Sequence, residues 1–120
     1  MNELERYVRW VLRHADKDGK ITFYHATLDI ERILVEGFEK RETPTYLTLS
    51  RKHAEEVLQE NNGHGCGGII RIRIPVSDFL AYLQRGIFFI SEDVHLSPHG
   101  KVEIVVRDAT VLNPYVERTY

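Results

Sequence analysis

The stretch Tyr24-His25-Ala26-Thr27 ends a run of β-branched and aromatic residues, which is typical of a β-strand. Directly after it, Thr27 or Asp29 can cap a short helix, and Gly37 is suited to end that helix. The end of a strand therefore meets the start of a helix. This junction points backbone N–H groups and the positive end of a helix dipole to the space beside His25, where an anion or a carboxamide oxygen can bind.

The chain before this stretch predicts an amphipathic helix within residues 1–15. Its apolar residues recur every three or four positions, with charged residues between them: Leu4, Tyr7, Val8, Val11 and Leu12. The run from Asp16 to Lys20 then predicts a turn, because it combines Asp and Gly residues.

The chain after this stretch predicts strands and short helices in alternation. We expect strands at residues 45–49, 69–74, 87–90, 102–106 and 111–116, helices after Ser50 and at residues 77–83, and a loop at residues 61–68. In the helix after Ser50, Ala54, Val57 and Leu58 face inward, and in strand 102–106 Ile104 faces inward by alternation. Pro114 indicates that the last strand lies at a sheet edge. The pattern predicts one α+β domain with antiparallel or mixed sheets.

Composition narrows the classes of function. The chain of 120 residues is the size of one domain, and its 16 basic and 18 acidic residues give a net charge of −2, which does not favour generic nucleic-acid binding. The single cysteine, Cys66, fits a reducing compartment, and we expect a cytoplasmic protein. No segment approaches the roughly 20 apolar residues of a membrane span, so no membrane partner is expected.

Residues 21–116 resemble the ADP-ribosyltransferase fold, in the His-Tyr-Glu branch of diphtheria-toxin-like and poly(ADP-ribose)-polymerase-like enzymes. The segments that carry the resemblance are Tyr24-His25-Ala26-Thr27, Gly37-Phe38, Thr45-Tyr46-Leu47-Thr48, Gly67-Gly68-Ile69-Ile70, Val102-Glu103-Ile104-Val105-Val106 and Val111-Leu112-Asn113-Pro114-Tyr115. They occur in the order of that family. The resemblance implies split β-sheets with flanking helices.

The resemblance also implies a function, namely NAD-dependent mono-ADP-ribosyl transfer to an unknown acceptor. In this chemistry Glu103 stabilises the cation that forms on the ribose when nicotinamide leaves, while Tyr46 stacks on nicotinamide. His25 binds the adenosine-side ribose. The catalytic residues implied are His25, Tyr46 and Glu103, and the NAD-binding residues are His25, Ala26, Thr27, Tyr46 and Ser50. Surface loops at residues 64–67 and 86–100 are expected to select the acceptor.

Three departures from the family pattern keep other functions open. Ala26 replaces a glycine, Val57 replaces a second stacking aromatic, and Lys101 replaces the Glu or Gln of enzymes that modify arginine, asparagine or cysteine. One alternative is a non-catalytic or NAD-hydrolysing relative that binds a nucleotide or a protein partner. Another is RNA 2′-phosphotransfer, which requires Arg/His pairs that the predicted strands lack.

A metal site is not expected. His64, Cys66, His95 and His99 have the right chemistry for zinc, but their spacing matches no known pattern, and the glycines around Cys66 do not favour an activated thiolate either.

Overall fold

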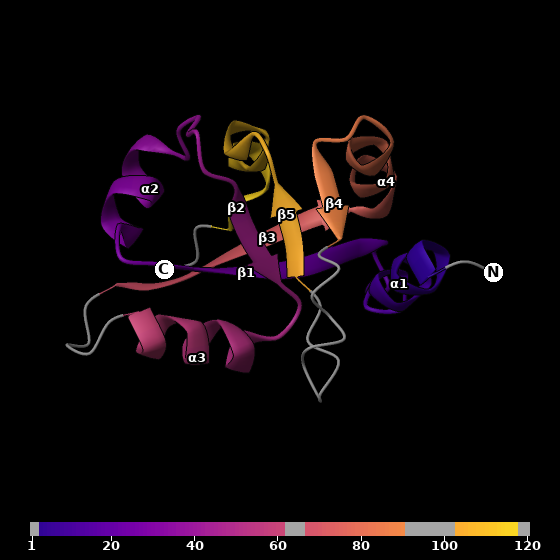
Figure 1. Ribbon diagram of the computed structural model, residues 1–120, viewed down its shortest axis with the longest axis horizontal. Coiled ribbons are helices and arrows are strands. Elements are labelled where there is room, and N and C mark those ends of the chain that lie inside the picture. The colour runs from indigo at the N-terminus through magenta and orange to yellow at the C-terminus, as the bar shows by residue number, and fades with distance from the viewer. Residues whose placement is uncertain (1–2, 62–66, 91–102, 118–120) are drawn as a thin grey trace.

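The computed structural model describes residues 3–61, 67–90 and 103–117. The elements follow the chain in an alternating order (Figure 1): α1 (Glu3–Leu12), β1 (Lys20–Thr27), α2 (Ile30–Glu36), β2 (Thr45–Thr48), α3 (Arg51–Asn61), β3 (Gly68–Pro75), α4 (Val76–Gln84), β4 (Phe88–Ile90), β5 (Glu103–Val106) and the 3₁₀-helix η2 (Ala109–Tyr115). This is an α+β domain with flanking helices, as the sequence predicts.

The five strands form one antiparallel sheet in the order β3-β1-β2-β5-β4. β1 pairs over very different lengths with its two neighbours, β3 and β2. β1 pairs with β3 over eight residues, from Lys20↔Pro75 to Thr27↔Gly68, whereas β1 pairs with β2 at Tyr24↔Thr48 alone. In Figure 1, β1 and β3 run across the view, while β2, β5 and β4 run steeply over them. The split sheets expected from the sequence are therefore one sheet with a narrow seam.

The hydrophobic core lies on one face of this sheet. Every second residue of the strands contributes to it: Ile21, Phe23, Leu47, Ile70, Ile72, Ile74, Phe88, Ile90, Ile104 and Val106. Side chains of α1, α2, α4 and η2 close over this face, among them Val11, Ile33, Phe79 and Leu112. α3 contacts β1, β2 and β3, and its buried Ala54 lies outside this core.

The expected edge strand at residues 111–116 is wrong, because residues 109–115 form η2 and only Val116 makes a bridge, to Ile72. The side chain of Asp108 caps η2 by accepting hydrogen bonds from the backbone N–H and the hydroxyl of Thr110, at 3.1 and 2.6 Å. Ala109 and Leu112 are three residues apart and both buried, which suits one helical face rather than a strand.

Two further expectations are confirmed. In β5 Ile104 is buried in the core, and Val105 is buried too, on the face opposite the core. The helix expected at residues 77–83 is α4, Val76–Gln84. Val102, the side chains of Leu4 and Tyr7, and residues 62–66 of the expected loop lie outside the described residues.

Candidate functional site

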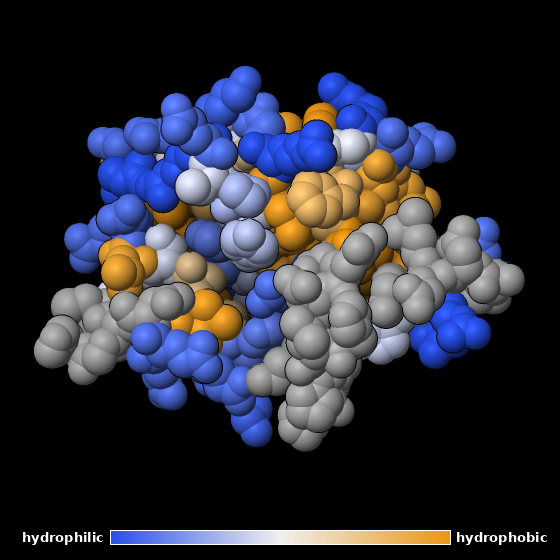
Figure 2. All heavy atoms as spheres, in the orientation of Figure 1, coloured by the Kyte–Doolittle hydropathy of each residue, from blue (hydrophilic) through white to orange (hydrophobic). Residues whose placement is uncertain are grey.

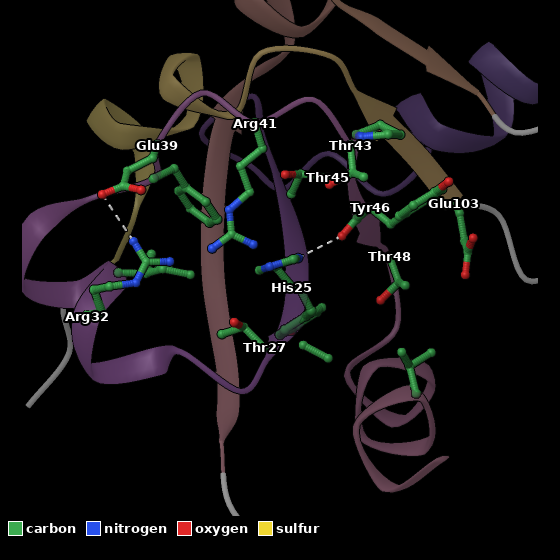
Figure 3. Close-up of a pocket in the computed structure, with 16 residues that line it drawn as sticks. His25, Thr27, Arg32, Glu39, Arg41, Thr43, Thr45, Tyr46, Thr48 and Glu103 are labelled. Carbon is green, nitrogen blue, oxygen red and sulfur yellow. Dashed lines mark hydrogen bonds and ion pairs between the residues drawn. The ribbon is translucent and has the colours of Figure 1, made fainter. Parts of the chain in front are cut away.

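The seam between β1 and β2 opens into a pocket. Continuing the register from Tyr24↔Thr48 would place Ala26 opposite Tyr46, but the two strands no longer pair there. A pocket of ≈ 220 Å³ lies where β1 and β2 separate (Figure 3). Its lining combines both sides of the seam with the loop after α2: Tyr24, His25, Ala26, Thr27, Arg32, Ile33, Phe38, Glu39, Arg41, Thr43, Pro44, Thr45, Tyr46, Thr48, Val57 and Glu103.

His25 bridges the seam. Its Nδ1 lies 2.9 Å from the backbone carbonyl oxygen of Tyr46, and because a carbonyl only accepts, Nδ1 carries the proton. Burial lowers the pKa of His25 from its ordinary value, the positive charge of Arg41 adds to this lowering, and the hydrogen bond to Tyr46 opposes it. The imidazole is therefore neutral near pH 7. Its Nε2 is left as a hydrogen-bond acceptor for a ligand hydroxyl.

Phe38 packs against the imidazole ring of His25. The two rings meet edge to face, with centroids 5.4 Å apart and an interplanar angle of 62°. Asn113 of η2 fixes the Phe38 backbone on both sides, because its Oδ1 accepts from the Phe38 N–H at 2.6 Å and its Nδ2 donates to the Phe38 carbonyl at 3.1 Å. The C-terminal segment thus supports the pocket without lining it.

Glycines at the start of β3 allow close packing against the end of β1. Gly67 has φ +93°, and a Cβ atom there would lie 2.5 Å from the carbonyl oxygen of Thr27. The Thr27 hydroxyl accepts a hydrogen bond from the N–H of Asp29 at 3.0 Å, whereas the Asp29 side chain caps nothing. Asp29 occupies the N-cap position of α2 and Thr27 bonds the residue before the helix, so neither of the two expected side-chain caps forms.

The face of β2 and β5 that points away from the core carries three polar side chains of the pocket. Tyr46 and Thr48 alternate with the core residue Leu47, and Thr48 pairs directly with Glu103. Tyr46 is half-exposed at 50%, so its ring is accessible to a ligand. Figure 3 shows the Glu103 carboxylate beside Tyr46 and Thr48. The structure thus brings His25, Tyr46 and Glu103, which come from three separate segments, to one pocket.

Two arginines that the sequence analysis missed line the pocket, and both are paired with carboxylates. Arg32 of α2 and Arg41 of the following loop both reach Asp29, with nitrogen–oxygen distances of 3.3 and 3.4 Å, and Arg32 also lies 3.4 Å from Glu39. These pairs are partly exposed and are therefore weak. Figure 2 shows hydrophilic residues over α2 and this loop, and hydrophobic ones over β4 and β5. No periodic pattern in the sequence marks either arginine.

The remaining predicted residues divide into two groups. Ala26 and Thr27 line the pocket, and Ala26 has no positive φ, so its side chain causes no backbone strain. Val57 also lines the pocket, at the position where the resemblance expects an aromatic ring. Ser50 does not line it. Its hydroxyl instead accepts a hydrogen bond from the backbone N–H of His53 at 3.3 Å and caps α3. The expected role of Ser50 in NAD binding is therefore not supported.

His53, which the sequence analysis also missed, lies behind the pocket. Its Nε2 is 3.4 Å from Oε1 of Glu103, and its side chain is only 12% exposed. One sequence feature could have indicated that His53 lies near the sheet, because it directly precedes Ala54, which faces inward on α3.

In residues 3–61, 67–90 and 103–117, no three His, Cys, Asp or Glu side chains gather as metal ligands. His64, Cys66, His95 and His99 lie outside these ranges, as do most of the loops expected to select an acceptor. Within the same ranges, no helix is long and apolar enough to cross a membrane.

Comparisons with protein families, with curated proteins and with solved structures found no match to this chain.

Proposed function

We propose that this protein is an NAD-dependent mono-ADP-ribosyltransferase of the His-Tyr-Glu branch. The observation that carries the proposal is the meeting of His25, Tyr46 and Glu103 in one pocket at the seam of the sheet. Their segments are far apart in the sequence, and each carries one of the motifs that resemble the family. The seam, with β1 and β2 joined at one residue pair, leaves room for a ligand between the segments that carry these residues.

The residues suit the chemistry in detail. When the bond between C1′ of the ribose and the nicotinamide nitrogen breaks, its electron pair leaves with neutral nicotinamide and positive charge develops on the ribose. The Glu103 carboxylate stabilises this charge. An acceptor nucleophile then bonds to C1′ and releases its proton to solvent. The acceptor is unknown.

The pocket also suits the binding of NAD as the substrate. The half-exposed Tyr46 offers a ring for stacking on nicotinamide at the pocket of ≈ 220 Å³. Neutral His25 can accept a hydrogen bond from a ribose hydroxyl at its Nε2. Arg32 and Arg41 can bind the diphosphate when it displaces the carboxylates of Asp29 and Glu39.

A second candidate is a non-catalytic or NAD-hydrolysing protein of the same fold. Val57 favours it, because an aliphatic side chain replaces the second stacking ring on the pocket wall. Weak stacking lowers affinity and leaves the ribose more open to water.

The test is incubation of the purified protein with NAD labelled in its adenosine half, alone and with a lysate. Released nicotinamide and labelled macromolecules together indicate transfer, whereas nicotinamide with free ADP-ribose indicates hydrolysis. Glu55→Gln is the matched control for Glu103→Gln, since Glu55 is an exposed glutamate of α3 outside the pocket. Absence of NAD binding at millimolar concentration in calorimetry would overturn both the transferase and the NAD hydrolase, and would leave a non-catalytic protein that binds another nucleotide or a protein partner.

A further inference from the structure

Glu103 has a neighbour whose role the proposed function does not include. It precedes the core residue Ile104 on β5, so its side chain points away from the core, toward the side where α3 contacts the sheet. There, Nε2 of His53 lies 3.4 Å from Oε1 of Glu103. His53 does not line the pocket, whereas Glu103 does.

The side chains of His53 and Glu103 differ in their exposure to solvent. The side chain of His53 is 12% exposed and that of Glu103 is 32% exposed. The imidazole is thus held by packing and the carboxylate is the freer partner. The start of α3 is fixed by the Ser50 side chain, whose hydroxyl accepts a hydrogen bond from the backbone N–H of His53. His53 therefore offers a nearly fixed donor against which a glutamate with three rotatable bonds can be oriented.

We propose that His53 is a positioning residue, which holds Oε1 of Glu103 and leaves the other carboxylate oxygen for the ribose. This inference rests on the proposed function. Glu103 acts on developing charge, so its effect depends on where its oxygens lie, and displacement of a catalytic group by about 1 Å can cost about 100-fold in rate. In the substrate complex the 3.4 Å contact is expected to shorten, as apo contacts of catalytic groups commonly do.

The matched variants are His53→Gln and His53→Asn. Glutamine can place its amide nitrogen where Nε2 lies, whereas asparagine places it where Nδ1 lies and leaves Oε1 without a donor. Both side chains are polar. Asparagine is close to histidine in helix propensity and glutamine is slightly higher, so both variants are expected to fold, and thermal unfolding checks this. Lys52→Ala, an exposed neighbour on α3, is the control for general effects on the helix.

The measurement is the single-turnover rate of nicotinamide release, together with the Kd of NAD from calorimetry. We expect His53→Asn to lose at least about 10-fold in rate at nearly unchanged Kd, and His53→Gln to retain most of the wild-type rate. In the Glu103→Gln background, His53→Asn is expected to cost nothing more, because the group through which His53 acts is already disabled.

An unchanged rate in His53→Asn, an equal loss in both variants, or an undiminished further loss in the Glu103→Gln background would overturn the role of His53. Each of these outcomes leaves the proposed function standing, provided that the wild type turns over NAD. A wild type that neither binds NAD nor releases nicotinamide overturns the proposed function, and with it the role of His53 in that reaction.

Discussion

The two pairings of β1 differ sharply. With β3 it forms a ladder of eight residue pairs, in which Phe23 and Ile72 pair on the core face and both are fully buried. With β2 it shares one pair, and beyond this pair a histidine side chain, not the backbone, makes the next bond across the seam. The long ladder provides stability, whereas the incomplete pairing provides the space in which a ligand can bind.

The largest effect is expected in the ladder. Phe23→Ala removes a fully buried ring that packs against Phe79, with ring centroids 5.6 Å apart, and should lower the free energy of unfolding by about 3–5 kcal/mol. Urea denaturation checks this, and Phe23→Leu serves as a milder variant if the first does not fold. A loss below about 1 kcal/mol would contradict the assignment of the ladder as the stable part of the fold.

The second largest effect is expected from Glu103→Gln, on the other side of the seam. The amide keeps the shape of the side chain but cannot stabilise a cation, so turnover of NAD should fall by about 100-fold or more. NAD affinity and the unfolding temperature should stay near those of the wild type. Unchanged nicotinamide release in this variant would remove Glu103 from the chemistry.

The burial of His25 at the seam predicts a pH dependence of stability. Burial lowers the pKa of His25 in the folded state, so the unfolded chain, with a pKa of about 6.5, binds the proton more readily. The stabilising contribution is complete above about pH 6.5 and is lost as the pH falls toward the folded pKa. The loss is at most about 1.4 kcal/mol per pH unit for one proton.

His25→Asn isolates this contribution, because the amide nitrogen can still donate to the Tyr46 carbonyl but does not titrate. Between about pH 7.5 and about pH 5, the wild type should lose more stability than His25→Asn in urea denaturation. Parallel curves for the two proteins would show that His25 does not titrate differently in the folded and unfolded states.

A smaller effect is expected at Tyr46, whose ring is half-exposed on the pocket side of the seam. Tyr46→Ala should weaken NAD binding by the stacking energy of roughly 0.5–1.5 kcal/mol, with little change in stability. Tyr46→Phe should bind nearly as the wild type does in calorimetry. Equal losses in the two variants would assign the interaction to the hydroxyl instead of the ring.

The smallest effect is expected from Val57→Tyr, which adds a ring to the opposite pocket wall. NAD binding should tighten by an amount near the lower end of the stacking range, about 0.5 kcal/mol. The same titration measures it, and weaker binding would indicate that the pocket is too narrow for a second ring.

Much of the fold could be predicted from local patterns. The alternation of isoleucine with arginine along residues 69–74 predicts β3 and its buried face, and Gly37 predicts the end of α2. The interpretation failed where local signals conflict with tertiary contacts. Residues 111–116 have the β-branched composition of a strand, yet the Asp108 cap and the burial of Leu112 produce a 3₁₀-helix.

The sequence by itself determined most of the secondary elements, because strand and helix periodicity are local properties. Its resemblance to the ADP-ribosyltransferase fold selected His25, Tyr46 and Glu103 as candidates. Only the tertiary structure decided that these three share a pocket with Val57, and that Arg32, Arg41 and His53 adjoin it. It also decided that Ser50 does not line that pocket. The physical reason is that contacts across the seam depend on where β1 and β2 separate, and this follows from the packing of the whole sheet on its helices.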